Sequence, residues 1–379
     1  MQDAETVLNV LRERGRRGLP CTELYRQLFN PSLYELAHGR IYANHGAMTP
    51  GADGETADGM SQARTLRIID ALRHERYRCQ PVKRAWIPEK NGKLRPLGLP
   101  SWSDKLVGEV IRLLLEAYYE PQFSGRSHGF RPGRGCRTAL REAEDARSGT
   151  TWFTEGDISD CFGSPDHEIM ARILAEKIHD NRFLRLIRNM LEAGYLEDRE
   201  WNATLSGVPQ GGVASPVLSN IYLDRLGKFA ETVLIPEYTR GKIRVANPEY
   251  ARLTRAISDA WRRGDRRAVR QLRVRRRGVP RGDPGDPRYR RLRYIRYADD
   301  HLLGLTGPRA EAEQIKQRLA ELLRDDLKLE LNQDKTLITH ARTQAAPFPG
   351  YQVTVQHSRD RPAVNGVVRL RVPRPVITA

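Results

Sequence analysis

The chain has 379 residues and a mass of 43.3 kDa, enough for two or three subdomains around a substantial core. Hydrophobic residues make up 39% and charged residues 29%, which excludes a disordered tail, and no apolar run approaches the roughly 20 residues that span a bilayer. The net charge of +17 is concentrated, because the segment from Arg240 to Arg296 holds 20 basic and only 5 acidic side chains.

The N-terminal part of the chain predicts helices and one hairpin. Residues 1–60 are polar and broken by Gly and Pro, with a short helical pattern over Leu24–Leu36. The alternation of Val82–Ile87 predicts a strand, and Asn91-Gly92 after it is typical of a two-residue hairpin turn. Hydrophobic periodicity also predicts a helix over Arg64–Arg76, with an apolar stripe at Leu66, Ile69 and Leu72.

Cap residues mark the starts of the next helices. Asp104 is the expected N-cap of a long apolar helix. Thr151–Ile158 predicts a strand that runs into Asp157. Two Ser-Pro pairs, Ser164-Pro165 and Ser215-Pro216, each predict a cap followed by a proline at the first helical position.

The basic segment predicts two helices. Asn247 caps the first, whose apolar face holds Leu253, Ile257 and Trp261, and the second begins at Arg266. Each helix has one thin apolar stripe and wide Arg faces, so we expect a hairpin docked on the body and turned outward. The charge favours a polyanion as partner; the alternative is a solvated pair of charged helices.

The C-terminal part predicts further strands around one helix. Two short apolar segments flank Ala298-Asp299-Asp300, and Pro308 begins a helix. The expected strand pairs are Leu327–Leu331 with Thr336–Thr339, and Pro349–Val355 with Gly366–Val372. Helices therefore alternate with antiparallel hairpins, which predicts an α+β platform rather than a doubly wound parallel sheet.

Cysteine usage indicates the compartment. The four cysteines lie far apart and form no Cys-x-x-Cys pair, so neither a structural zinc nor a disulfide framework is expected. The first 17 residues lack the apolar core of a secretory signal. We therefore expect the reducing cytoplasm.

Adjacent carboxylates mark the candidate catalytic site. Asp299 and Asp300 lie in the string Tyr297-Ala298-Asp299-Asp300, and neighbouring anions repel unless a cation lies between them. Mg²⁺ prefers oxygen ligands, and Asp157 supplies a third carboxylate at a strand end. Two-metal phosphoryl transfer requires such a set. Alone, the four-residue string also fits a solvated turn.

Seven sequence blocks follow one another in an informative order: Ile87–Lys105, His128–Arg134, Asp157–Phe162, Ser206–Asn220, Tyr297–Asp300, Asn332–His340 and Phe348–Tyr351. In these blocks the chain resembles a group II intron-encoded reverse transcriptase of the maturase type. The basic segment also resembles the insertion that this family carries. The resemblance implies an α+β fold, namely the fingers and palm of a right-hand polymerase, with an antiparallel palm sheet packed on helices and a basic helical insertion.

The resemblance also implies a division of the chain. The family continues into a thumb and a maturase domain, so we expect this chain to be a fragment or a truncated product that ends near the start of the thumb. The expected parts are an N-terminal extension (1–60), fingers (61–150), a first palm segment (151–239), the Arg-rich insertion (240–290), a second palm segment (291–351) and a closing hairpin leading toward the thumb (352–379).

The resemblance further implies an RNA-directed DNA polymerase. Its partners would be group II intron RNA, an RNA template with a DNA primer, and deoxynucleoside triphosphates. Two Mg²⁺ ions would be its cofactors, and no membrane partner is expected. The catalytic residues would be Asp157, Asp299 and Asp300, and the metal-binding residues would be these three together with Ile158.

A second set of residues would bind the nucleotide. Lys93 and Arg95 would hold the triphosphate, or else belong to a solvated hairpin. Gln210 and Gly211 would approach the nascent base pair, or else form a plain helix-entry loop. Phe162 would exclude a 2′-hydroxyl, or else be a core aromatic residue. Lys335 would assist proton transfer to pyrophosphate, or else make a surface salt bridge.

Arginines would bind the RNA. Arg131 and Arg134 would contact the template backbone, with a solvated surface as the alternative. In the Arg-rich insertion the expected RNA contacts are Arg262, Arg263, Arg266 and Arg267.

Two other functions stay open. The first is a catalytically inactive RNA-binding maturase relic, against which the three intact aspartates argue. The second is another palm polymerase, such as an RNA-dependent RNA polymerase or a retron-type reverse transcriptase. The Arg-rich insertion and the Pro-Gln-Gly-Gly string favour the group II family over it.

Overall fold

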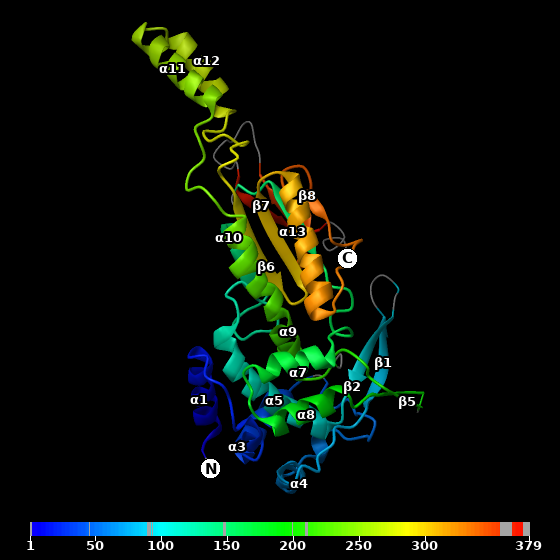
Figure 1. The fold of residues 1–379 in the computed structure, drawn as a ribbon. Coiled ribbons are helices and arrows are strands. Elements are labelled where there is room, and N and C mark those ends of the chain that lie inside the picture. Colours follow the sequence, from blue (N-terminus) through cyan, green and yellow to red (C-terminus); the bar gives the residue numbers. More distant parts are fainter. Residues whose placement is uncertain are drawn as a thin grey trace.

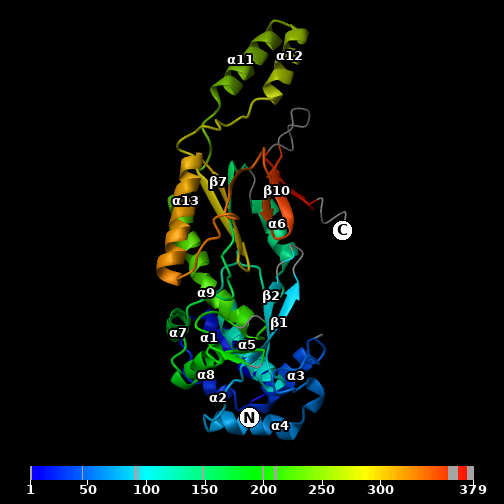
Figure 2. The same cartoon turned by 90° about the vertical axis from the view of Figure 1, so that its right-hand side faces the viewer.

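A computed structural model of the chain describes residues 2–44, 46–88, 92, 94–146, 149–198, 200–208, 211–356 and 366–373. Three parts follow one another along an elongated molecule: a helical base that contains the N-terminus, a central sheet, and a helical hairpin that projects away from the sheet (Figure 1). The turned view shows the same order (Figure 2). No helix among these residues is both long and apolar enough to cross a membrane.

The base is built around one long buried helix, α5 (Trp102–Tyr119). Against it packs α1 (Ala4–Arg16), which the sequence did not predict because polar residues surround its buried Val7, Leu8 and Leu11. The other helices of the base are α2 (Leu24–Gln27), α3 (Pro31–Ile41), α4 (Gln62–Arg73), α7 (His167–Ala175) and α8 (Asn181–Leu191), with short 3₁₀ turns at Ala57–Gly59 and Glu120–Gln122.

Local details of these helices correct the predictions. Ser101 caps α5, since its hydroxyl accepts a hydrogen bond from the amide of Asp104, which was the predicted cap. Asp166 rather than Ser164 caps α7. In α4 the predicted stripe is wrong at Leu66, which is 51% exposed.

A four-stranded sheet rises from the base, in the order β2-β1-β4-β5. The predicted hairpin is confirmed as β1 (Val82–Pro88) and β2 (Leu94–Leu99), although Asn91 lies outside the described residues. The other two strands, β4 (Tyr195–Glu197) and β5 (Glu200–Asn202), come from far along the chain.

The central sheet has the order β6-β7-β3-β8, and all its pairs are antiparallel. Its strands are β3 (Trp152–Gly156), β6 (Arg291–Tyr297), β7 (Asp300–Thr306) and β8 (Ile338–His340). The α+β architecture with an antiparallel sheet packed on helices is thereby confirmed. The predicted pairing of Leu327–Leu331 with Thr336–Thr339 is wrong, because β8 pairs with β3 instead.

Both faces of the central sheet are covered. One face packs against α9 (Ser215–Phe229) and α13 (Arg309–Glu321), and the other against α6 (Cys136–Ala146) and a small sheet. The small sheet has the order β11-β10-β9. Its strands are β9 (Ala346–Phe348), β10 (Tyr351–Val355) and β11 (Val368–Arg371). A π-helical turn at Ala230–Leu234 follows α9 and leads into α10 (Ile235–Glu237). A second π-helical turn, at Leu322–Asp326, follows α13.

The projecting hairpin consists of α11 (Pro248–Arg262) and α12 (Arg266–Arg277), as predicted, with Asn247 as the cap of α11. Its small core of Ile257, Ala260 and Val269 is separate from the cores of the body. The prediction for Trp261 is wrong, because this side chain is 64% exposed at the far end of α11.

Candidate active site

The two adjacent aspartates lie at the tight turn between β6 and β7. Tyr297 pairs with Asp300, so Ala298 and Asp299 form a two-residue loop. Ala298 has a φ of +54°, a conformation that two-residue hairpins favour but that strains a residue with a Cβ. The backbone of Gly129 packs so closely on Ala298 that a Cβ at Gly129 would overlap the Ala298 amide. The loop is therefore held from outside.

Asp157 reaches the same edge of the sheet from β3. Gly156 pairs with His301, which places Asp157 beside the start of β7, next to Asp300. One carboxylate oxygen of Asp157 lies 2.9 Å from the Lys335 ammonium. The three predicted catalytic residues thus come together from two separate parts of the chain.

Burial and mutual repulsion perturb the carboxylates of the turn. Burial is the main cause that raises the pKa of Asp300 to about 6, and the charges of Asp299 and Asp157 add to it. Burial also raises the pKa of Asp299, again with a contribution from Asp157, whereas Arg95 and Lys335 oppose the rise. A cation among these groups would relieve the repulsion.

A cavity of about 380 Å³ lies beside the turn. Asp157, Asp300 and Lys335 line it together with Glu155 and with the residues of the closing block at Phe348–Gly350. Glu155 is 4% exposed, and one of its carboxylate oxygens has no hydrogen-bond partner among the described residues. A larger cavity of about 780 Å³, between α13 and β8, contains none of the predicted aspartates.

The site matches Mg²⁺ in the kind of ligand atoms that it offers. The carboxylates of Glu155, Asp157, Asp300 and Asp334 are among the groups that line the cavity, and a hard cation prefers such oxygen ligands. However, within the described ranges no three His, Cys, Asp or Glu side chains form a group that could hold a metal ion. The three aspartates therefore do not form a ready-made ion site among these residues, and one carboxylate oxygen of Asp157 pairs with Lys335. Ile158 has its side chain in the core, so only its backbone could take part.

Removing one carboxylate should stabilise the metal-free protein. The pKa of Asp300 in the folded protein lies above its ordinary value of 3.8, so the folded state binds this proton more tightly than the unfolded state does. The stability that the protonated carboxyl contributes is fully present below about pH 4 and is lost as the pH rises through about 6. We expect Asp300→Asn to raise the free energy of unfolding at pH 7.5 by roughly 1 to 3 kcal/mol, measured in urea without metal.

The exposed Asp334 on the same cavity provides a matched control. Asp334→Asn should leave the unfolding free energy nearly unchanged. Added Mg²⁺ should stabilise the wild type more than Asp300→Asn. Equal stabilities of the two variants would contradict the repulsion at the turn.

Two members of the predicted nucleotide-binding set, Arg95 and Gly211, lie on or against β2. Arg95 is exposed on β2, and its charge acts on the pKa of Asp299. Gly211 has a φ of +96° and lies against β2, where a Cβ would overlap the Gly98 carbonyl oxygen. Glycine is therefore required there by both conformation and space. Lys93 and Gln210 lie outside the described residues.

Phe162 is partly buried against the main core, and its ring meets that of Phe130 edge to face, with centroids 6.2 Å apart. Phe130 itself is 54% exposed. The amide of Val208 donates a 2.7 Å hydrogen bond to the Phe162 carbonyl, which ties this segment to the loop before Gly211. The position is compatible with both predicted roles of Phe162.

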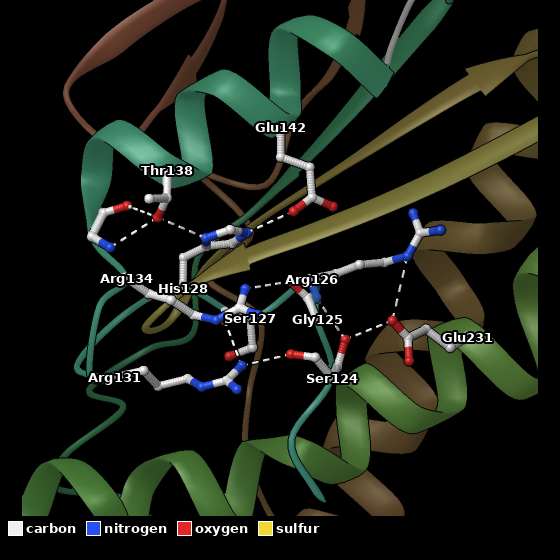
Figure 3. A network of polar contacts seen from close by, with 11 residues as sticks. Ser124, Gly125, Arg126, Ser127, His128, Arg131, Arg134, Thr138, Glu142 and Glu231 are labelled. Carbon is white, nitrogen blue, oxygen red and sulfur yellow. Dashed lines mark hydrogen bonds and ion pairs between the residues drawn. The ribbon is translucent and has the colours of Figure 1, made fainter. Parts of the chain in front are cut away.

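The predicted template contact of Arg131 is not supported. Its side chain is 3% exposed and pairs with Glu120 at 2.8 Å. Figure 3 shows the guanidinium reaching the carbonyl of Ser124, and it also donates to the carbonyl of Ser127. Arg131 therefore stabilises the turn that carries it, and a buried guanidinium is not available to a phosphate backbone. Arg134 is half-buried and donates to the Gly125 carbonyl at 2.6 Å.

The same segment contains a residue that the sequence did not single out. The buried imidazole of His128 lies between the Thr138 hydroxyl at 2.9 Å and the Glu142 carboxylate at 2.8 Å, both on α6 (Figure 3). Asn220 and Arg296 were also missed, although both lie in or directly beside the recognised blocks. Their full burial, which marks them, is a property of the tertiary structure.

The predicted RNA-binding arginines of the insertion lie on the projecting hairpin, outside the cavity of the aspartates. All four, Arg262, Arg263, Arg266 and Arg267, are exposed. The ion pair of Arg262 with Asp259 is long, at 3.8 Å.

Comparison with known proteins supports the resemblance that the sequence blocks indicated. Residues 87–244 match the family described as "Reverse transcriptase (RNA-dependent DNA polymerase)". The chain is 38% identical to the group II intron-encoded protein LtrA of Lactococcus lactis subsp. cremoris, over 93% of this chain and 61% of that protein. It is 33% identical to protein YkfC of Escherichia coli, over 90% of this chain and 85% of that protein.

A mitochondrial relative is similar over a smaller share of its own length. The putative COX1/OXI3 intron 1 protein of Saccharomyces cerevisiae is 32% identical, over 92% of this chain and 42% of that protein. This chain thus spans less than two thirds of LtrA and of the yeast protein. With the recognised blocks in order and the similarity extending over nine tenths of its length, the chain belongs to the reverse transcriptase family of group II intron-encoded proteins.

Proposed function

We propose that this chain is the polymerase part of a group II intron reverse transcriptase, and that it extends a DNA primer on an RNA template. The observation that carries the proposal is the meeting of Asp157, Asp299 and Asp300 at one edge of an antiparallel sheet, beside a cavity lined by Lys335. Primer extension on an RNA template in the presence of Mg²⁺ tests it. Absence of extension, with intact RNA binding, would favour the maturase relic instead.

Asp157, Asp299 and Asp300 would hold two Mg²⁺ ions, with Ile158 contributing only through its backbone. Bound Mg²⁺ supplies Lewis acidity at the primer hydroxyl and neutralises the developing charge of the triphosphate. The raised pKa values of Asp299 and Asp300 support this assignment, because a site that repels its own carboxylates gains from a cation.

The remaining site residues would bind and orient the nucleotide. Arg95 would hold the triphosphate together with Lys93, and Gly211 would let the backbone approach the nascent pair beside Gln210. The hydrogen bond that the Lys335 ammonium donates to the Asp157 carboxylate raises the pKa of Lys335, so the ammonium keeps its proton at neutral pH. Lys335 would leave Asp157 and donate a proton to an oxygen of the departing pyrophosphate.

Phe162 would select the sugar. We expect Phe162→Ala to admit ribonucleotides while deoxynucleotides are still used, because the smaller side chain leaves room for a 2′-hydroxyl. Steady-state kcat/KM for matched ribo- and deoxynucleotides measures the preference. Phe130→Ala, which removes the edge contact but not the ring beside the sugar, is the control. An unchanged preference in Phe162→Ala would leave Phe162 as a core aromatic.

The projecting hairpin would bind the intron RNA through its arginines, apart from the catalytic site. Its charge and its exposed Arg faces support this role, and Arg134 would add a template contact near the body. The chain would divide into fingers, palm and Arg-rich insertion as the resemblance implies. One change follows from the sheets: β4 and β5 extend the sheet of β1 and β2, so these strands go with the fingers.

A further inference from the structure

Arg296 is an arginine buried without a carboxylate. It is 1% exposed, and in the part of the chain that the structure describes no salt bridge involves it. One nitrogen, Nη1, donates to the Ala298 carbonyl at 2.7 Å and to the Asn220 side-chain oxygen at 3.2 Å. Nε and Nη2 make no hydrogen bond among the described residues. Burying a guanidinium in this way is costly to stability, which points to a role of Arg296 other than stabilising the fold.

Asn220 extends the contact to a second segment. Its side chain is buried on α9, and its amide nitrogen donates to the Gly129 carbonyl at 2.9 Å. The amide therefore bridges α9, the segment around Gly129 and the guanidinium of Arg296. Arg296 has the same parity in β6 as Leu292 and Tyr294, so its side chain leaves the central sheet on the α9 face. Tyr297, the partner of Asp300, belongs to the other face.

The backbone of Arg296 is held by the same segment. Its amide donates to the Arg126 carbonyl, and its carbonyl accepts from the His128 amide, both at 2.9 Å. Gly129 in turn packs on Ala298 with no room for a Cβ. Segment 126–129 thus adds to the edge of β6 immediately before the turn.

We infer that Arg296 and Asn220 form a brace, defined by their contacts with Ala298 and Gly129, that sets the orientation of the turn bearing Asp299 and Asp300. The peptide between Ala298 and Asp299 is planar, so fixing the Ala298 carbonyl fixes the peptide plane from which Asp299 leaves. Ala298 has a positive φ and would otherwise relax toward an unstrained conformation. Arg296 is a positioning residue, since it acts through the turn; the kinetic consequence rests on the proposed function.

The test combines single-nucleotide addition with metal binding. Asn220→Ala and Arg296→Met should lower kcat by about 10- to 100-fold, because small misplacements of reacting groups have effects of this size. KM for the nucleotide should change by less than about three-fold, since the triphosphate contacts remain. Mn²⁺ binding, measured by electron paramagnetic resonance on the protein with a terminated primer–template, should weaken in both variants.

Conservative and control variants separate positioning from stability. Arg296→Lys should recover part of kcat, because an ammonium has N–H donors for the same two acceptors but is not held in place by a planar guanidinium. Arg112, which pairs with Glu109 and Glu116 on α5, is the matched control: Arg112→Met should lower the free energy of unfolding without changing Mn²⁺ binding.

A double-mutant cycle decides whether the two residues act as one unit. The Asn220→Ala and Arg296→Met double variant should be no slower than the slower single variant. Additive losses, or Mn²⁺ binding that is unaltered in folded single variants, would overturn the brace. If the wild type binds Mn²⁺ but extends no primer, the proposed function fails, while the effect of the variants on Mn²⁺ affinity still decides the inference. If Arg296→Met does not fold, Asn220→Ala and Arg296→Lys carry the same test.

Discussion

Replacing Asp157 by Asn is expected to lower primer extension by about a thousand-fold or more, because metal-ion catalysis contributes several kcal/mol and each 1.36 kcal/mol is a factor of ten. Asp300→Asn should have a similar effect. Both changes keep the size of the side chain and remove only its charge. Asp157→Asn also frees Lys335, which is 67% exposed and can remain solvated, so the fold should persist.

The measurement is single-turnover extension of an annealed DNA primer on RNA, with Asp334→Asn as the control that removes a charge from the same cavity. That control should retain the wild-type rate within a factor of about two, because its carboxylate is not in the proposed metal set. RNA affinity should be unchanged or slightly higher in the aspartate variants. Extension by Asp157→Asn at the control's rate would refute the proposed catalytic set.

The second large effect is expected on RNA binding. Residues 240–296 hold most of the net charge, and the small core of the hairpin leaves its arginines outward. Binding to phosphates by counterion release gives a log–log salt slope of roughly 0.7 to 0.9 per phosphate neutralised. Replacing six exposed arginines by glutamine should therefore weaken RNA binding for all sequences alike and flatten the salt slope. The six are Arg262, Arg263, Arg266, Arg267, Arg270 and Arg273.

Lysine at the same six positions is the matched control, since it keeps the charge and should keep most of the slope. Filter binding of a structured RNA between low and moderate salt measures the slope. Extension of a short primer–template should suffer much less than binding, because the hairpin lies away from the cavity of the aspartates. An unaltered slope in the glutamine variant would identify the hairpin as a solvated surface.

Local sequence signals determined much of this protein. Strand alternation and turn residues predicted the β1–β2 hairpin, and the Asn-Pro cap predicted the start of α11. The order of short blocks predicted the family and the three aspartates. The hairpin and cap signals act within a few residues, through dihedral preferences, caps and alternation, and need no partner from elsewhere in the chain, whereas the blocks work through their resemblance to a family.

The tertiary structure decided what depends on distant partners. Helix α1 is stabilised by packing on α5 rather than by its own pattern, and β8 pairs with β3 rather than with the segment before it. The sequence predicted that Arg131 contacts the template backbone, but its side chain is buried against Glu120. It also predicted that Trp261 belongs to the apolar face of its helix, but this side chain is exposed. The brace of Arg296 and Asn220 exists only where α9, segment 126–129 and the β6–β7 turn meet. Whether a charged side chain is buried, and which group it pairs with, is decided by the whole fold. The reason is that either a neighbouring residue or one far along the chain can supply its hydrogen bonds or its counter-charge.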